Sequence, residues 1–480
     1  MNINIATAKI NSIFLAIVLI AGTFAAVYPS FIIGIQAQSE YENSYRYENN
    51  NDSYNSEYPL SSEYPTTEYE RDSYNTAEYS PSSYEYPKSE YPQALSDEYE
   101  SNYENDNSYY PPTQEPISAD IVVPIDFDTI QEAIDAANEG DVIKVLPGTY
   151  TEQLTINKTL TIIGSGVKST IIEAPPLEEL ELNVIGLPYI VEVNDEAEVT
   201  MEGFTIKGPE GTDCGQLIGV SVLEDGTIDL KHAIVKGCTD NAILIGAPPF
   251  FPGGPQVGHA TITKTFVTDY QNHGVFALGS NTTLTMSSNN IISSNPNALA
   301  TVGILFVFGA TGTITHNEVS DNICNIPDTC GPDFFNQFQA FGIVADSAGQ
   351  GSVISNNYVS NNDGGIGVVG ESGCCIVDKN KLKDNRFFGI VILDGNHTVS
   401  NTKIFGGQVG ASAIAFSSNT TATLDSVKIV DAEIPIQALS TGNLTAAVNV
   451  LSPSIFLPRL TFTYYSLLFL IQSLIIFSNF

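Results

Sequence analysis

The sequence predicts an all-β solenoid of about ten short stacked coils, with a helix over the first coil. One observation is a phrase of four residues that recurs down the second half of the chain: a small residue, an apolar residue, any residue and an apolar residue. It begins at residues 219, 242, 274, 303, 342, 365, 389, 413 and 435. Most of these starts lie 22 to 24 residues apart. A period in the low twenties that is built on strand-like alternation is typical of a solenoid.

The alternation within the phrase separates an inner face from an outer face. Successive side chains of a strand point to opposite faces, so the second and fourth residues share one face. These residues are apolar in most copies, as in Val220 and Val222 or Ile390 and Ile392, which predicts that they face the interior. The predicted outward residues are Ser221, Leu244, Phe276, Leu305, Val344, Gly367, Val391, Ala415 and Gln437.

A second observation is a repeated frame of apolar residues and asparagines. Residues 314–322, 354–362 and 377–385 share it, and residues 290–295 fit part of it. Side-chain amides at turns can donate to one coil and accept from the next, which favours a structural role. The frame predicts two columns, one of Asn290, Asn317, Asn357 and Asn380, the other of Asn295, Asn322, Asn362 and Asn385.

The opening of the solenoid is the third observation. Residues 128–134 (DTIQEAI) predict a capped helix that ends by Gly140, and the strand-like segments 142–150 and 160–164 follow. With the repeats, this opening resembles the right-handed parallel β-helix proteins of the pectin-lyase-like superfamily, over residues 118–452. The resemblance implies a right-handed coil with a helix over its N-terminal end. It also implies polysaccharide chemistry, because that superfamily includes pectate lyases, polygalacturonases, pectinesterases and epimerases, whose sites lie on the outer face of one sheet.

The predicted outward row is mostly apolar, which argues against an enzyme. General acid–base catalysis requires titratable groups within reach of one bond. The candidate catalytic residues are Asp346, Glu371 and Asp394, which follow the strand on three consecutive coils. The alternatives for these carboxylates are a Ca²⁺ site and ordinary acidic turns. We expect no other cofactor and no metal site.

An outward apolar row in an exported protein is either covered or used for binding. The segments 246–258 and 323–340, which lengthen two repeats, are the candidate covers. If the row binds a ligand, stacked apolar and aromatic residues suit the face of a sugar or a partner protein. The candidate binding residues are Phe276, Leu305, Val344 and Val391.

The two ends of the chain differ from its centre. Residues 1–38 predict a signal peptide or an N-terminal anchor, and residues 455–480 a hydrophobic tail that is a candidate membrane anchor. Residues 39–116 are rich in Tyr, Glu, Ser and Asn, and they contain too few aliphatic residues for a core, so we expect disorder. The β-helix is expected over residues 117–452. The formal net charge of −37 argues against nucleic acid as a partner.

Six cysteines fit an oxidising compartment. The candidate disulfide residues are Cys214 with Cys238, one repeat apart, and Cys324 with Cys330, across one loop. Cys374 and Cys375 are adjacent, and we expect other partners or free thiols there rather than a bond between them. Candidate glycosylation sites, all in Asn-x-Ser/Thr sequences, are Asn157, Asn281, Asn396, Asn419 and Asn443.

The leading hypothesis is an exported cell-surface β-helix that acts as a non-catalytic glycan-binding or adhesion module. The alternatives are a polysaccharide lyase or glycoside hydrolase and a structural component of the cell envelope. Polysaccharide or surface glycan is the expected partner, with a membrane contacted through the terminal hydrophobic segments. The sequence leaves the ligand and the oligomeric state open.

Overall fold

The computed structural model describes residues 119–209, 211, 215–237, 239–293, 301–326, 328–334, 336–370, 374–406, 411–417 and 420–439. It also describes the backbone of residues 445–452, 455–456 and 460–462. The signal or anchor expected over residues 1–38, the segment 39–116 and most of the hydrophobic tail therefore lie outside the described residues.

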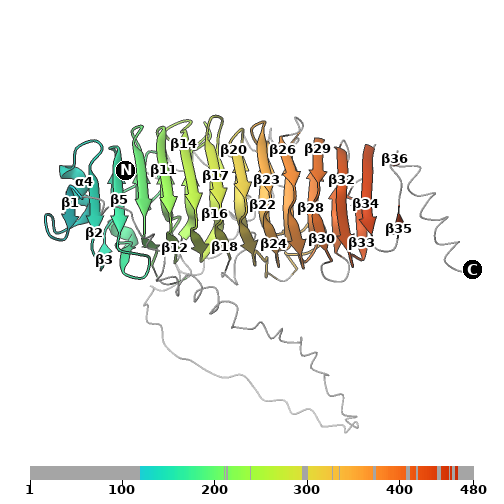
Figure 1. The fold of residues 1–480 in the computed structure, drawn as a ribbon, viewed down its shortest axis with the longest axis horizontal. Coiled ribbons are helices and arrows are strands. Elements are labelled where there is room, and N and C mark those ends of the chain that lie inside the picture. Colours follow the sequence, from blue (N-terminus) through green and yellow to red (C-terminus); the bar gives the residue numbers. More distant parts are fainter. Residues whose placement is uncertain are drawn as a thin grey trace, which may run out of the picture. The chain divides into compact units, whose positions relative to one another are not determined.

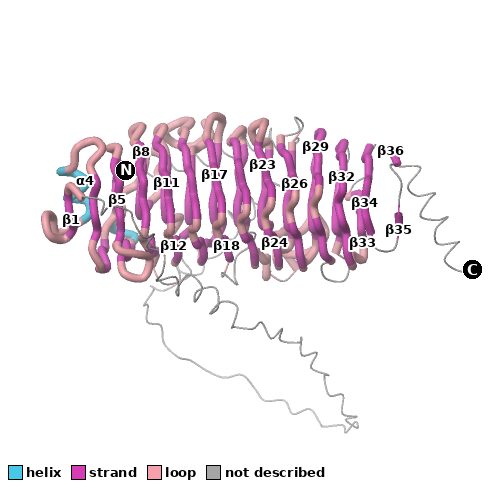
Figure 2. Tube along the Cα trace, viewed as in Figure 1, coloured by secondary structure: helices cyan, strands magenta, loops and turns pink. Residues whose placement is uncertain are grey.

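The described chain winds into a parallel β-helix, in which each coil contributes strands to three parallel ladders (Figures 1 and 2). The strands of sheet 1 are β1 (Ile121–Val123), β2 (Val142–Val145), β5 (Leu160–Gly164), β8 (Glu198–Glu202), β11 (Gly226–Lys231), β14 (Gly258–Thr263), β17 (Thr283–Ser287), β20 (Thr311–Thr315), β23 (Ser352–Ser355), β26 (Cys375–Asp378), β29 (Gly395–Ser400), β32 (Thr420–Val430) and β34 (Thr445–Ser452).

The strands of sheet 2 are β3 (Gly148–Thr151), β6 (Thr170–Glu173), β9 (Thr205–Lys207), β12 (Ile234–Lys236), β15 (Phe266–Thr268), β18 (Asn290–Ile292), β21 (Glu318–Ser320), β24 (Tyr358–Ser360), β27 (Lys381–Lys383) and β30 (Lys403–Phe405). The long strand β32 pairs with both β29 and β30, so it joins sheet 2 to sheet 1.

Sheet 3 has 11 strands among the described residues. They are β4 (Leu154–Ile156), β7 (Tyr189–Val193), β10 (Ile218–Val222), β13 (Thr239–Ile245), β16 (Tyr270–Leu278), β19 (Val302–Val307), β22 (Phe341–Asp346), β25 (Gly364–Val369), β28 (Phe388–Leu393), β31 (Ser412–Phe416) and β33 (Ile434–Ala438). All nine copies of the recurring phrase lie on the last nine of these strands. The prediction of an all-β solenoid is confirmed.

The inward residues of the phrase form the core. Val220, Val222, Ile390 and Ile392 are completely buried, as are their counterparts in most other coils. The first residue of the phrase is small because neighbouring coils leave no room there for a larger side chain. At Gly303, a Cβ atom would lie 2.5 Å from a Val319 methyl carbon and 2.7 Å from the Gly342 carbonyl oxygen. A larger side chain would therefore push neighbouring coils apart.

Two buried asparagine columns connect the coils, one at the turn before each sheet 2 strand and the other at the turn after it. Asn317 Nδ2 donates to Asn357 Oδ1 (3.1 Å), and Asn357 Nδ2 donates to Asn380 Oδ1 (3.1 Å). The column begins at Asn289, whose Nδ2 donates to Asn317 Oδ1 (2.9 Å). The sequence assignment of Asn290 to this column is wrong by one residue. Asn290 instead starts strand β18 and pairs with Glu318.

The backbone explains this difference. A left-handed residue immediately precedes each member of the column: Ser288, His316, Asn356 and Lys379 have φ values between 55° and 60°. In the second column, Asn322 Nδ2 donates to Asn362 Oδ1 (2.8 Å), and Asn362 Nδ2 donates to Asn385 Oδ1 (3.1 Å). The prediction is confirmed for these three residues, whereas Asn295 lies outside the described residues.

Helix α4 (Ile130–Ala136) closes the first coil. Thr129 caps it, and Glu132 completes a capping box. Ile130, Ala133 and Ile134 are completely buried. The helix ends at Ala136, before the expected stop at Gly140, because the backbone is already extended at the capping residue Ala137.

The C-terminal end of the described chain turns back on itself. Strands β35 (Ile455–Phe456) and β36 (Leu460–Phe462) pair antiparallel with β34. No helix among the described residues is long and apolar enough to cross a membrane. Residues 463–480 of the candidate anchor lie outside the description.

The described cysteines form two bonds. Cys324 is bonded to Cys330, with 5.6 Å between their Cα atoms, which confirms the predicted pair. Cys374 is bonded to Cys375, which corrects the expectation of other partners or free thiols. The two residues lie side by side at the start of β26 and are both buried, so each is the nearest thiol to the other. Cys214 and Cys238 lie outside the described residues.

Candidate functional site

The outer face of sheet 3 carries the row predicted from the phrase. Ser221, Leu244 and Phe276 occupy equivalent positions on successive strands, and the pairing continues through Gln437. The structure extends the row backwards to Glu192 on β7 and Thr155 on β4. Neither residue follows from the recurring phrase, because their coils lack the small residue that opens it. The alternation in Val191-Glu192-Val193 was the available signal.

The first insert, residues 246–258, covers part of the apolar row. Phe251 packs against the cluster that contains Leu244 and Leu305. The ring of Phe250 meets the ring of Phe308 edge-on, with 5.6 Å between centroids. Leu305 is 8% exposed and is therefore a core residue rather than an accessible binding residue.

The second insert, residues 323–340, covers the row farther along the solenoid. The ring of Phe334 meets those of Phe341 and Phe388 edge-on, at 6.5 and 5.8 Å between centroids. These rings belong to a cluster that includes Val391, which is 1% exposed. Of the four candidate binding residues, only Phe276 and Val344 remain half-buried.

Asp363 anchors both ends of the second insert. Its Oδ2 accepts hydrogen bonds from the backbone nitrogens of Cys324 (2.9 Å) and Ala340 (3.0 Å). Arg386 Nε lies 3.3 Å from its Oδ1. The carboxylate is completely buried, and this burial raises its pKa to about 6, against the lowering effect of the two backbone donors and of Arg386. One side chain therefore ties the insert to the coil beneath it.

A polar cluster occupies the N-terminal end of the outer row. Glu192 is 3% exposed. Tyr189 Oη lies 2.8 Å from Thr155 Oγ1, and Asn183 Nδ2 donates to Ser221 Oγ (3.3 Å). Burial raises the pKa of Glu192 to about 7, and the nearby Glu224 carboxylate adds to this, while hydrogen bonds from Ser221 and Tyr189 oppose it. Glu192 is therefore partly protonated at neutral pH and can donate or accept a proton.

A second polar cluster lies two to three coils farther along. The rings of His273 and Phe276 are stacked, with 4.3 Å between centroids. His273 Nδ1 lies 2.7 Å from Asn241 Oδ1, and Asn272 Nδ2 donates to Asp240 Oδ1 at 2.5 Å. Burial lowers the pKa of His273, so its imidazole is neutral at neutral pH. The cluster combines an aromatic pair with amide and carboxylate groups.

The acidic candidates from the sequence do not come together. Asp346 is in register with Val369 and then with Leu393, the residue before Asp394. Asp346 and Asp394 are therefore two coils apart, about 10 Å along the axis at the usual strand spacing. Glu371 lies outside the described residues. No group of three metal-ligating side chains occurs among the described residues.

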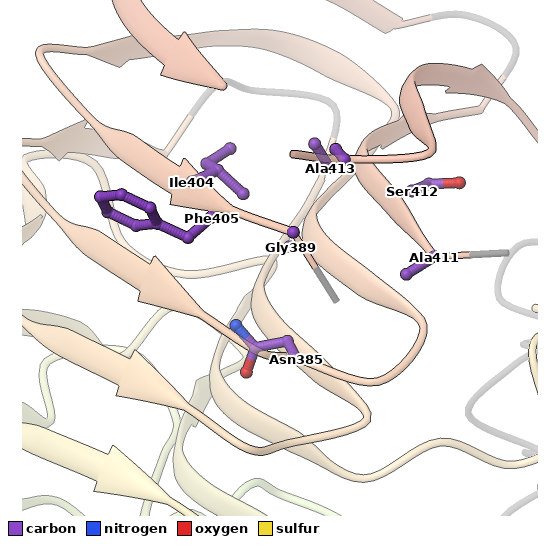
Figure 3. Close-up of a pocket in the computed structure, with 9 residues that line it drawn as sticks. Asn385, Gly389, Ile404, Phe405, Ala411, Ser412 and Ala413 are labelled. Carbon is purple, nitrogen blue, oxygen red and sulfur yellow. The ribbon is translucent and has the colours of Figure 1, made fainter. Parts of the chain in front are cut away.

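A small hollow lies near the C-terminal end of the coils (Figure 3). It is lined by Asn385, Gly389, Ile404, Phe405, Gly406, Ala411, Ser412, Ala413 and Ala432. It has room for about one water molecule, which is too little for a sugar ring. We therefore place the candidate site on the outer face of sheet 3 and not in this hollow.

Three candidate glycosylation residues, Asn157, Asn281 and Asn396, are exposed. Asn396 lies within strand β29, paired with Thr421. Asn419 and Asn443 lie outside the described residues.

One family model matches part of the β-helix. Residues 255–427 match the family model described as "Right handed beta helix region". A comparison with curated proteins gives no match.

Similar solved structures include the catalytic domain of Agl-KA, at 14% identity and a TM-score of 0.44, covering 70% of this chain and 69% of that chain. They include the A-module of the mannuronan C-5 epimerase AlgE6 of Azotobacter vinelandii, at 15% identity and a TM-score of 0.37, covering 69% and 95% of the two chains. An alginate lyase from Paenibacillus sp. is similar at 13% identity and a TM-score of 0.32, covering 67% and 95%. The stacked parallel coils make the fold of this chain a parallel β-helix, and the family model that matches residues 255–427 describes a right-handed one.

Proposed function

We propose that this protein is a non-catalytic glycan-binding or adhesion module of the cell surface. The observation that carries the proposal is the His273–Phe276 ring pair beside Asn241, Asn272 and Asp240. Apolar ring faces suit the C–H face of a sugar, and fixed amide and carboxylate groups suit its hydroxyls. Asp240 and His273 are engaged with the side-chain amides of Asn272 and Asn241, and burial lowers the pKa of His273, so the arrangement does not present the acid–base pair that cleavage of a glycosidic bond requires.

The two inserts also support a binding module over an enzyme. They bury Leu305 and Val391 beneath their own aromatic side chains, so much of the outer row is part of the core. An enzyme that cleaves within a polysaccharide chain must leave room for several sugars along its surface. Of the four candidate binding residues on the outer row, only Phe276 and Val344 are half-buried rather than buried.

The test is a glycan array followed by titration of the best ligand with Phe276→Ala. Loss of one stacking residue is expected to weaken binding about tenfold, since aromatic contacts contribute about 0.5–1.5 kcal/mol beyond the buried area. Phe266→Ala, which removes a half-buried ring from β15 on sheet 2, is the matched control and should bind normally. Equal binding by the wild type and both variants would contradict this location for the site.

The second candidate function is a polysaccharide lyase or glycoside hydrolase, and Glu192 favours it. Its raised pKa would suit a general acid, and Glu224 provides a second carboxylate nearby. A depolymerisation screen with purified polysaccharides separates the two functions. Product release that Glu192→Gln abolishes would establish the enzyme and refute the non-catalytic proposal.

We further propose export through residues 1–38 and retention at the surface through residues 455–480. The apolar composition of both segments supports this proposal. Fractionation of cells that produce the full chain and the chain ending at residue 452 tests it. Release of only the shorter chain into the medium is the expected result.

A further inference from the structure

The outer face of sheet 1 carries a column of uncharged β-branched side chains. Consecutive strands of the sheet, from β14 to β32, contribute one residue each, and these residues are paired in register from coil to coil. Most of them are exposed, and the others are half-buried. We call them the β-branched column: Thr261, Thr285, Thr313, Val353, Ile376, Thr398 and Thr423.

Further hydroxyl groups flank the column on β14, β17 and β20. In register on its two sides lie Thr283 with Thr311, and Thr263 with Ser287 and Thr315. The remaining outward residue of these three strands is His259, whose Nδ1 lies 2.8 Å from Thr283 Oγ1. Every outward residue of these strands except His259 therefore carries a hydroxyl group.

The area is uncharged although the chain has a formal net charge of −37. None of the outward residues of β14, β17 and β20 is Asp, Glu, Lys or Arg. Charged residues return at the edges of the area. Asp229 and Lys231 lie one strand earlier, on β11, and Asp378 lies beside the column on β26. The area therefore suits an electrically neutral partner.

The side chains of this area are regularly spaced and rigid. Adjacent strands lie about 4.8 Å apart, and successive outward residues of one strand lie about 6.7 Å apart. β-branched side chains are restricted at χ1. Figures 1 and 2 show the strands of sheet 1 side by side with nearly the same direction. The methyl and hydroxyl groups therefore form a nearly rectangular net that is in place before any partner binds.

Strand propensity explains only part of this pattern. β-branched residues favour strands, and Thr pairs on adjacent strands stabilise a sheet. That preference does not require an apolar side chain in water, yet Ile376 is 53% exposed within the column. Protein interfaces are enriched in Tyr, Trp and Phe, and the column and the hydroxyl groups beside it include none of these. The surface is therefore poorly matched to a protein partner.

We propose that this face of sheet 1 binds the surface of ice. Water molecules on the prism faces of ice form a rectangular net, and both of its repeats are close to the two spacings of the side chains. A Thr hydroxyl can donate one hydrogen bond and accept others, as a water molecule of the lattice does. The methyl groups beside it restrict the orientation of neighbouring water. The site is on sheet 1 and does not depend on the function proposed for sheet 3.

Such a site depends on flat contact over several coils, because each hydroxyl group contributes little by itself. A long side chain in the middle of the net would hold the protein away from the crystal. Thr285 is the best position for this change. It is exposed, and its neighbours Thr261, Thr313, Thr283 and Ser287 all belong to the net.

The test measures thermal hysteresis, the gap between the melting and freezing points of an ice crystal, in solutions of the purified full chain. A second readout is the fraction of the protein that slowly growing ice takes up. The test variant is Thr285→Lys, and Thr313→Lys repeats the change one strand farther along. The matched control is Thr149→Lys, which adds the same side chain at an exposed threonine of β3 on sheet 2. Thermal unfolding of each variant reports its stability.

The wild type and Thr149→Lys should show hysteresis and enter the ice. Thr285→Lys and Thr313→Lys should lose most of both effects while they unfold at the same temperature as the control. A wild type that shows neither effect would overturn the proposal, as would equal activity of all three variants. Sedimentation gives one more outcome: if Thr285→Lys separates a dimer into monomers and neither form affects ice, this face is a contact between copies of the chain and the proposal is wrong.

Discussion

Replacing Glu192 with glutamine should change the pH dependence of stability. In the folded protein the pKa of Glu192 is raised to about 7 from an ordinary value of 4.5, chiefly by burial. The folded state therefore holds this proton more tightly than the unfolded state. The contribution of Glu192 to the free energy of unfolding is most favourable below about pH 4.5 and is lost as the pH rises to about 7.

The magnitude follows from the two pKa values. A difference between 4.5 and about 7 corresponds to about 3 kcal/mol of stability at pH 8. Glutamine has nearly the same shape but carries no charge at any pH. It can still accept a hydrogen bond from Ser221 or Tyr189, so the variant should keep the local structure and lose the cost of burying a charge.

The assay is guanidinium unfolding of the wild type and Glu192→Gln from pH 4.5 to pH 8.5. As the pH rises, the free energy of unfolding of the variant should increase relative to that of the wild type by up to about 3 kcal/mol. Most of this change should occur below pH 7. Glu198→Gln, at an exposed carboxylate on β8, is the control. Parallel pH profiles for the wild type and Glu192→Gln would refute the reasoning, because they would mean that Glu192 ionises as easily in the fold as outside it.

Two further predictions concern buried polar groups. Asp363→Ala removes the acceptor for the backbone nitrogens of Cys324 and Ala340. Each of these donors costs about 1–3 kcal/mol of stability if it is left without a hydrogen bond. Limited proteolysis should therefore show faster cleavage within residues 323–340. Cleavage at the wild-type rate would show that the insert does not depend on Asp363. Asn357→Ala interrupts the column between Asn317 and Asn380. Thermal unfolding should show a loss of about 2–5 kcal/mol in the free energy of unfolding. The control Asn396→Ala, at an exposed residue, should change stability little. Equal effects of the two asparagine substitutions would contradict a structural role for the column.

The architecture of the coils can be predicted from the local pattern of apolar residues in the sequence. In a solenoid each coil buries its own short apolar pairs, so inward residues such as Ile390 and Ile392 recur at nearly constant spacing. The outward row from Ser221 to Gln437 was predicted residue by residue for the same reason. The helix that closes the first coil was also readable, because its cap and buried face involve residues within one or two turns of each other.

Other features depended on contacts between coils and could not be read from one coil alone. The asparagine column starts at Asn289 because the left-handed turn at Ser288 sets the register, and both neighbouring residues are asparagines. Glu192 does not follow from the recurring phrase, because its coil lacks the small first residue. Lys381, Lys403 and Lys428 align on sheet 2 although they are 22 and 25 positions apart. The inserts bury Leu305 and Val391 only after the chain has folded. Sequence alone determined which side chains of each coil face the interior, because this depends on the alternation within one strand. The tertiary structure decided which residues cover the outer face and which surface charges align, because these depend on how the inserts pack and how the coils stack.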